Sequence, residues 1–233
     1  MASLLDATAE ALSLLFNGDT ALWEIVGISF EVSAIALLIA TPPALLLAFV
    51  LAYGQFPGRR LTISLFSTLL SVPTVVIGLT LYLLLSRQGP LGDFRLLFTQ
   101  TAIVLGQIVL AFPMLVSIGH SALQAADRRA WETARTLGAS PFRALLTVTY
   151  EVRFGLLAAV LASFGRIISE VGASMMLGGN ILHHTRNIPT AIALETSKGE
   201  FAQGIALGMV LLVLAFTLNI LLHHFQGKGH IGS

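Results

Sequence analysis

Five long apolar runs constrain this chain more than any other feature of its sequence. Crossing the roughly 30 Å hydrocarbon core of a bilayer takes about 20 mostly apolar residues as a helix, and each run is long enough. The runs lie at 27–53, 61–85, 99–123, 152–177 and 201–224. A membrane β-barrel would instead alternate apolar and polar residues in segments of about ten. The sequence therefore predicts an all-α, polytopic membrane protein with five transmembrane helices.

The charge content argues against the soluble alternatives. Only 11% of the 233 residues are charged and 55% are hydrophobic, whereas an average soluble domain is about 25% charged. Too little charge remains to cover the surface of a soluble globule. Thirteen Lys and Arg against 12 Asp and Glu disfavour nucleic-acid binding. Because the chain has no cysteine, it has no disulfide, thiolate metal site or cysteine nucleophile.

The basic residues predict the orientation of the spans. Lys and Arg are enriched in cytoplasmic loops, and an N-terminus outside places eight of the 13 on the inner side and four on the outer side. The inner set is Arg59, Arg60, Arg128, Arg129, Arg135, Arg143, Arg153 and Lys228, and the outer set is Arg87, Arg95, Arg186 and Lys198. We expect the N-terminus outside and the C-terminus inside.

Three regions follow from these spans. Residues 27–225 form the transmembrane domain, and residues 226–233 form a polar, glycine-rich C-terminal tail. Residues 1–26 form an outer segment, in which Leu4, Leu12 and Phe16 lie at roughly helical spacing. This segment is either a short amphipathic helix on the membrane surface or a frayed end.

The inner loop at 124–151 is the longest polar segment between spans. Residues 124–137 are rich in alanine and favour a helix. Gly138 ends or bends that helix, and Ser140 before Pro141 is typical of an N-cap followed by the first helical position. The sequence therefore predicts two helices joined by a glycine turn.

The run at 132–143 within this loop resembles the EAA loop of ABC-importer permeases. Glu132, Ala134, Gly138 and Val148 fall at the spacing of that family's pattern, and the loop lies between the third and fourth of five spans, as in the family. The chain departs from the pattern at Thr133 and at Tyr150-Glu151, which replace an alanine and a Leu-Pro pair.

The resemblance implies a type I permease fold whose loop acts as a coupling helix in a groove of a cytoplasmic ATPase subunit. The residues it assigns to this contact are Glu132, Ala134, Leu137, Gly138, Ala139, Ser140, Pro141 and Phe142. It also implies a homodimer, two ATPase subunits that hold ATP and Mg²⁺, an external binding protein, and the cytoplasmic membrane of a bacterium or archaeon. The chain has no Walker-type phosphate loop, so we expect no catalytic residue and no cofactor in it.

Further stretches resemble the molybdate, tungstate and sulfate branch of these permeases, and within it most nearly the tungstate importers. They lie at 17–23, 56–60, 71–79, 88–92, 165–181 and 185–199. Molybdate and sulfate stay open as substrates because these tetrahedral dianions are alike in charge and shape. The alternative of another class is a stand-alone channel or secondary transporter, although no internal repeat of the kind common in secondary transporters is evident.

Arg166 and Glu170 lie four residues apart in the fourth predicted span, so they face the same side of a helix and can pair. Ionisable residues at this depth usually face a bundle interior or water. The pair is either a neutralised packing element or part of an oxyanion pathway. Clusters of His, Asp or Glu with the three or four donors of a metal site are absent from the sequence.

The remaining candidates for the pathway or its gates lie near prolines and glycines. Pro73 and Pro113 interrupt backbone hydrogen bonding inside spans, and they are either gate positions or packing kinks. Gly178 and Gly179 form either a tight outer turn or a set of backbone donors for an anion. The other candidates beside these positions are Val75, Val76, Met114, Asn180 and Thr185.

Overall fold

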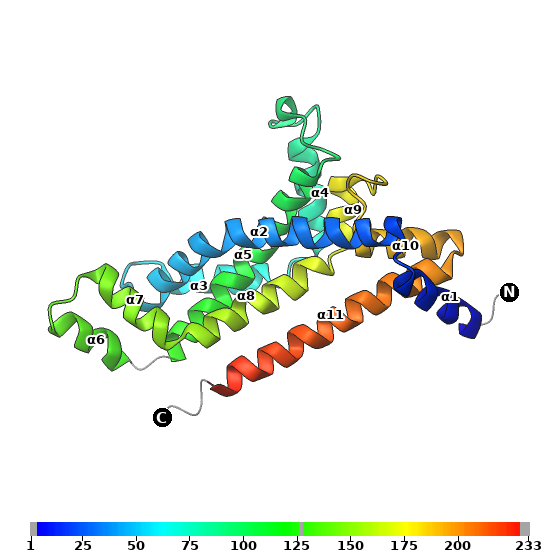
Figure 1. Cartoon of the computed structure of the whole chain (residues 1–233). Helices are drawn as coiled ribbons and strands as arrows, with labels where there is room; N and C mark the ends of the chain where they lie inside the picture. Colours follow the sequence, from blue (N-terminus) through cyan, green and yellow to red (C-terminus); the bar gives the residue numbers. More distant parts are fainter. Residues whose placement is uncertain (1–3, 126–127, 229–233) are drawn as a thin grey trace. The chain divides into compact units, whose positions relative to one another are not determined.

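The structure is a computed structural model that describes residues 4–125 and 128–228 (Figure 1). Within this part, only the backbone is described at 4–7, 128–130, 134, 141 and 225–228. The helices are α1 Leu4–Phe16, α2 Thr20–Tyr53, α3 Arg59–Leu69, α4 Thr74–Leu85, the 3₁₀ helix η1 Gly92–Phe94, α5 Gln100–Ala125, α6 Arg128–Thr136, α7 Pro141–Glu151, α8 Arg153–Ile168, α9 Gly172–Gly178, α10 Ile188–Lys198 and α11 Phe201–Lys228. The described residues contain no strand, and the predicted all-α class is confirmed.

Three helices, α2, α5 and α11, are long and apolar enough to cross a membrane. The pairs α3 with α4 and α7 with α8 each pass the same test together, which raises the number of candidate spans to five if each bent pair is one span. The predicted spans at 61–85 and 152–177 are not continuous helices. The first is divided between Leu69 and Thr74, and the second between Ile168 and Gly172.

Local chemistry explains both divisions. Pro73 lacks an amide hydrogen and disfavours the helical conformation of the residue before it, so α3 ends before Pro73 and α4 begins after it. At the second division, the Glu170 carboxylate accepts a hydrogen bond from the Ala173 amide in the first turn of α9. A side chain that supplies this bond stabilises the start of a new helix. Pro113 has no such effect, because α5 continues through it.

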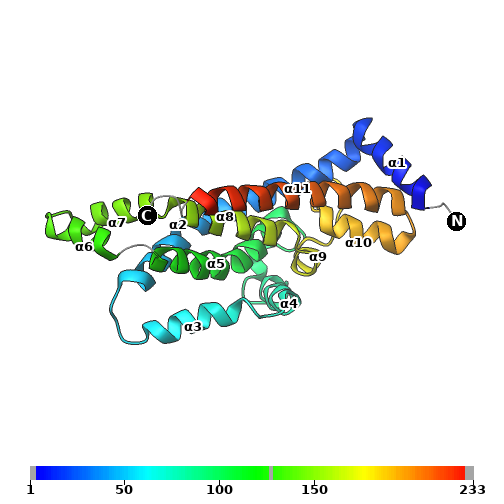
Figure 2. The same ribbon diagram turned by 90° about the horizontal axis from the view of Figure 1, so that it is seen from below.

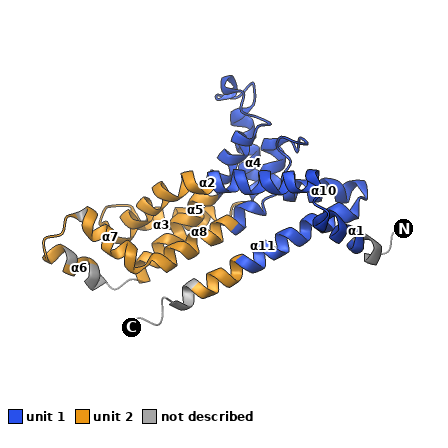
Figure 3. Cartoon of the chain, in the orientation of Figure 1, with its two compact units in different colours: residues 1–36, 73–110, 165–217 blue, residues 37–72, 111–164, 218–233 orange. Residues whose placement is uncertain are grey.

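The chain forms two compact units, which Figure 3 colours separately. The first unit contains residues 1–36, 73–110 and 165–217. One of its apolar clusters joins α1, α2, α10 and α11 around Ala11, Leu22, Ile188 and Leu207. A second cluster joins α4, α5 and α9.

The second unit contains residues 37–72, 111–164 and 218–233. Its apolar cluster packs Ala48 and Ala52 of α2 against Leu123 of α5, Val148 of α7 and Leu156 of α8. α7 and α8 bend by 75° at the break after Glu151. This unit contains the described residues of the loop predicted at 124–151.

Candidate functional site

The predicted coupling segment forms a helical hairpin in the second unit. α6 ends at Thr136, α7 begins at Pro141, and both views show the two helices side by side (Figures 1 and 2). Gly138 has a φ of 84°, a left-handed conformation that glycine adopts without the steric penalty of a Cβ atom. This residue lets the chain reverse direction between the helices.

Two polar contacts hold the turn. Ser140 is the N-cap of α7, where its Oγ accepts a hydrogen bond from the Arg143 amide at 3.3 Å. The Arg135 guanidinium donates to the Ala139 carbonyl at 2.8 Å. N-capping satisfies an amide that the helix itself leaves unpaired. The predicted helix, glycine turn and second helix are confirmed.

The hairpin tip exposes apolar side chains. Leu137 is 82% exposed and Phe142 is 66% exposed, while Ala139 is half-buried and Glu132 is exposed on α6. A Cβ added at Gly138 would meet no atom within 4 Å. Large apolar side chains gathered on an exposed feature are typical of a protein docking surface. Two other predicted contact residues, Ala134 and Pro141, have side chains outside the described part of the structure.

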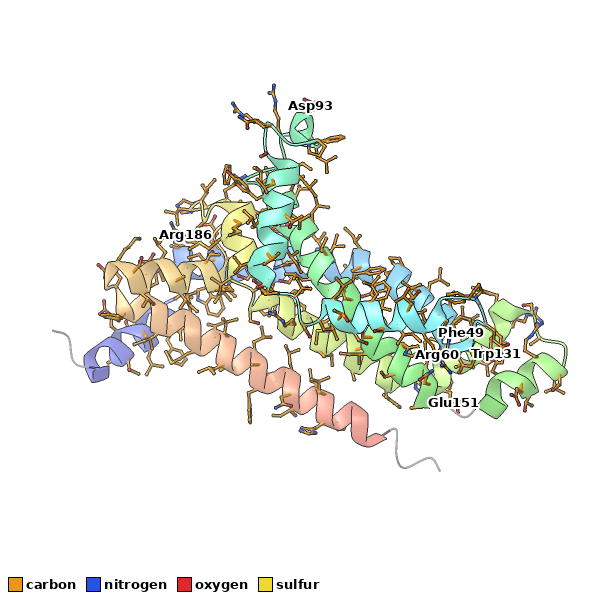
Figure 4. All side chains as sticks on the ribbon, turned by 180° about the vertical axis from the view of Figure 1, so that it is seen from behind. Phe49, Arg60, Asp93, Trp131, Glu151 and Arg186 are labelled. Atoms are coloured by element: carbon orange, nitrogen blue, oxygen red, sulfur yellow. The ribbon has the colours of Figure 1, made fainter. Side chains whose placement is uncertain are left out.

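An aromatic cluster anchors α6 to the last turns of α2. The Trp131 ring lies 5.3 Å from the Phe49 ring and 5.1 Å from the Tyr53 ring, measured between centroids. Figure 4 labels Phe49 and Trp131 at the same end of this unit. Aromatic pairs at such distances contribute about 0.5–1.5 kcal/mol beyond their burial. The exposed tip therefore extends from an anchored base.

In the first unit, a buried carboxylate lies at the break between α8 and α9. The Glu170 side chain is 4% exposed and accepts hydrogen bonds from Arg166 Nη1 at 3.0 Å and from the Ala173 amide at 3.3 Å. The Arg166 side chain is 48% exposed. An exposed guanidinium within an apolar helical region points to a water-filled path or a bundle interior. Its positive charge can attract an anion, and Glu170 fixes its position.

α4 and α9 approach each other closely beside this break. A Cβ on Gly78 would lie 2.8 Å from the Ala173 Cα, and a Cβ on Gly172 would lie 2.9 Å from a methyl group of Val75. Such distances are shorter than real Cβ contacts allow, so only glycine fits at both positions without movement. The close packing fixes the start of α9, where Glu170 is bound.

The predicted gate residues are divided between the two units. Pro73, Val75 and Val76 belong to the first unit, where all three are exposed at the start of α4. Pro113 and Met114 belong to the second unit, where Pro113 is buried and Met114 is half-buried in α5. Only the first three are gathered at the N-terminus of one helix.

The predicted outer turn closes on itself. Gly179 and Asn180 have φ values of 69° and 53°, and the buried Thr185 hydroxyl donates to the Gly178 carbonyl at 2.6 Å and accepts from the Ile181 amide at 2.9 Å. The Asn180 side-chain amide donates to the Thr190 carbonyl at 3.3 Å. Because the Thr185 hydroxyl and the Asn180 amide nitrogen already bond to this turn and to α10, the geometry favours a closed turn over direct contact with an anion.

A charge cluster that was not among the predicted site residues joins this turn to α10. Glu195 is buried, with its Oε1 3.1 Å from Lys198 Nζ and 3.8 Å from Arg186 Nη1. Arg186 also donates to the Asn180 carbonyl at 3.5 Å. The i,i+3 spacing of Glu195 and Lys198 is enough to predict that these two residues pair on one helix. Arg186 lies in a loop, and no sequence periodicity predicts where a loop residue makes contact.

Comparison with known proteins gives three findings. Residues 32–228 match the family described as "Binding-protein-dependent transport system inner membrane component". The chain is 41% identical to the "Tungstate uptake system permease protein TupB" of Campylobacter jejuni over 96% of this chain and 93% of that protein. It is 39% identical to a "Probable anion ABC transporter permease protein" of Haloferax volcanii over 90% of this chain and 92% of that protein.

Solved structures show the same fold. An amino acid ABC transporter crystallised with histidines aligns with a TM-score of 0.66 and 18% identity, over 93% of this chain and 97% of that one. At this identity the likeness shows the fold alone.

Proposed function

The chain belongs to the family of binding-protein-dependent transport system inner membrane components, and from this membership we propose that it is the permease subunit of an ABC importer for tungstate. The observation that carries the substrate is the similarity to a tungstate permease, which extends over nearly the whole chain. Molybdate and sulfate are the competing oxyanions. In this proposal the permease lies in the cytoplasmic membrane, with its N-terminus outside and the α6–α7 hairpin inside.

ATP hydrolysis takes place in two cytoplasmic partner subunits, which bind ATP and Mg²⁺. The α6–α7 hairpin docks into a groove of one such subunit, and Leu137 and Phe142 supply the apolar contact. Full burial of side chains of this kind is worth roughly 1.5–3 kcal/mol each. Closure of the ATPase pair would move the hairpins of two permease copies as rigid bodies and switch the pore between its inward and outward states.

Support for the hairpin's role comes from its exposed tip and its anchored base. The tip leaves Leu137 and Phe142 uncovered by the described residues of this chain, while the aromatic cluster of Trp131 fixes α6 to α2. A segment that transmits movement from one subunit to another needs an exposed contact surface and a rigid connection to the helices that move.

In this proposal the Arg166–Glu170 pair serves the oxyanion path. A dianion gains electrostatic stabilisation from the half-exposed guanidinium, and Glu170 neutralises enough of that charge to prevent tight binding. Release matters as much as attraction for a transported ion. Val75 and Val76, exposed at the start of α4, are the apolar neighbours along the same path.

Reconstitution tests the function directly. Proteoliposomes with this chain, the ATPase subunits and the oxyanion-binding protein of the same source should accumulate tungstate when ATP is supplied inside. Labelled molybdate and sulfate in parallel vesicles give the order of substrates. Preference for either of these over tungstate would overturn the substrate assignment. ATP-independent oxyanion flux through this chain alone would favour the channel alternative.

A further inference from the structure

A cavity of about 750 Å³ lies in the second unit at the end of α2. Its walls are the last residues of α2, the loop at 54–58, the first residues of α3, and Trp131 and Glu132 of α6. Small-molecule sites usually measure roughly 300–1,000 Å³, so the cavity has the size of a ligand site. Neither the docking tip nor the Arg166–Glu170 pair includes these residues, apart from Glu132.

Opposite charges line this cavity. Arg60 and Glu132 both belong to its walls, and neither side chain forms an ion pair or hydrogen bond with the residues that the structure describes. Arg59 differs, because its guanidinium donates to the Leu51 carbonyl at 2.5 Å and to the Ala52 carbonyl at 3.5 Å. Arg59 thus stabilises the C-terminus of α2, and Arg60 is left to bind a ligand. A ligand that carries both an anion and a cation satisfies both free charges.

An aromatic wall complements these charges. Trp131 and Tyr53 line the cavity with ring centroids 5.1 Å apart. The faces of such rings attract ammonium groups, and Trp and Tyr are enriched where a membrane protein meets the headgroup layer. Figure 4 shows Arg60 and Trp131 labelled at the same end of the unit.

The cavity lies at the C-terminal end of a candidate membrane span. It begins where α2, a helix long and apolar enough to cross a membrane, ends at Tyr53. α3 leads away from it with Leu61 75% exposed and Leu65 54% exposed, and none of its described side chains is buried. Exposed leucines beside a headgroup-sized cavity suit an acyl chain.

We propose that this cavity binds a zwitterionic phospholipid with a primary amine, such as phosphatidylethanolamine. The phosphate pairs with Arg60 near the N-terminal amides of α3. The ammonium group lies against Glu132 and the Trp131 ring, and an acyl chain follows Leu61 and Leu65. Glu132 disfavours a lipid of net negative charge, and the Tyr53 and Trp131 rings, residue types enriched at the headgroup layer, favour a lipid over a segment of the ATPase.

The two tryptophans of the chain make the site measurable without transport or ATPase. In a Trp23→Phe background Trp131 is the sole tryptophan. The full chain in detergent micelles is titrated with phosphatidylethanolamine or phosphatidylglycerol brominated close to the glycerol, and quenching of Trp131 is recorded. We expect phosphatidylethanolamine to associate about tenfold more tightly, the ratio that one net charged contact gives.

Variants test each contact. Arg60→Gln should weaken phosphatidylethanolamine binding about tenfold, and Glu132→Gln should reverse the preference toward phosphatidylglycerol. Arg143→Gln, an exposed arginine of α7 outside the cavity walls, is the matched control and should change neither. Equal quenching by both lipids, or an unchanged preference in Arg60→Gln and Glu132→Gln, would overturn the proposal.

Two further arms identify the source of the ligand. Soluble glycerophosphoethanolamine carries the same headgroup without acyl chains, and its binding as tightly as the lipid would overturn the membrane assignment. Displacement of bound phosphatidylethanolamine from Trp131 by added ATPase subunit at stoichiometric concentration would assign the cavity to that protein instead. Loss of tungstate uptake has no bearing on this assay, so failure of the lipid proposal and failure of the proposed function are distinguishable.

Discussion

The hairpin of α6 and α7 and the turn between α8 and α10 use their side chains in opposite ways. The hairpin exposes Leu137 and Phe142 and leaves the Glu132 side chain unpaired among the described residues, whereas the turn buries Thr185 and pairs Glu170 with Arg166. An exposed apolar tip gains stability only when a partner covers it. The turn bonds its Thr185 hydroxyl and its Glu170 carboxylate within the same unit, so these groups need no partner protein. The first region is therefore built for docking and the second for holding a fixed geometry.

The largest effect should come from charging the hairpin tip. Leu137→Asp with Phe142→Asp removes two apolar contacts worth roughly 1.5–3 kcal/mol each, so affinity for the ATPase subunit should fall more than about 100-fold. Because both side chains are exposed in the free chain, the thermal midpoint should stay near that of the parent. Affinity is measured by titrating labelled ATPase subunit onto the full chain in detergent.

Thr147→Asp, an exposed position farther along α7, is the control for added charge and should leave this affinity unchanged. Parent-like affinity in the double variant would show that the exposed tip is not the docking surface. The exposure of the hairpin tip would then have no connection with ATPase binding, and it would not distinguish the hairpin from the turn in function.

A second prediction separates the turn geometry from the contact. Gly138→Asp places a side chain at a φ of 84°, which costs about 1–2 kcal/mol for most residues, and adds charge at the tip. We expect ATPase affinity to fall about tenfold or more. Gly18→Asp is matched, because Gly18 has a φ of 69° and equally open surroundings, and it should lose similar stability but no affinity. Equal affinities in the two variants would contradict a docking role for Gly138.

The third prediction concerns the fixed region. Arg166→Gln removes the exposed positive charge, and Glu170→Gln keeps an acceptor for the Ala173 amide while it releases Arg166. Both should lower tungstate uptake about tenfold, since a hydrogen bond to a charged group is worth roughly 1.5–3 kcal/mol, with ATPase affinity unchanged. Arg95→Gln, an exposed arginine of the same unit, is the control. Uptake at the parent rate in both variants would assign the pair to packing alone.

The two regions also differ in how far the sequence predicts them. The family and the helix–turn–helix are confirmed, because Gly138 and the Ser140 cap act locally and leave a readable pattern. The break at Pro73 follows from a single residue. The break at 169–171 has no proline and depends on the Glu170 carboxylate. The four-residue spacing from Arg166 to Glu170 is equally compatible with an unbroken helix, so the sequence does not predict this break. The Arg186–Glu195 contact joins a loop to a helix and depends on tertiary folding.

The smallest expected effect is the difference in stability loss between two helix-cap substitutions, one in each region. Ser140 caps α7 at the exposed tip, whereas Asn187 is buried and accepts hydrogen bonds from the amide of Thr190 at 3.2 Å and from its hydroxyl at 2.9 Å. Ser140→Ala should cost about 1 kcal/mol of helix stability, since water can replace the lost oxygen. Asn187→Ala leaves the buried Thr190 amide without its acceptor, at about 1–3 kcal/mol, while the Thr190 hydroxyl keeps its bond to the backbone carbonyl of residue 187.

The thermal midpoint of the full chain in one detergent should therefore fall further for Asn187→Ala than for Ser140→Ala. An equal or reversed order would mean that water reaches the α9–α10 turn as freely as it reaches the hairpin tip. Water access would in turn weaken the reason for treating that turn as a closed structure, because Thr185 and Asn180 would then be free to exchange their internal bonds for contacts with an ion.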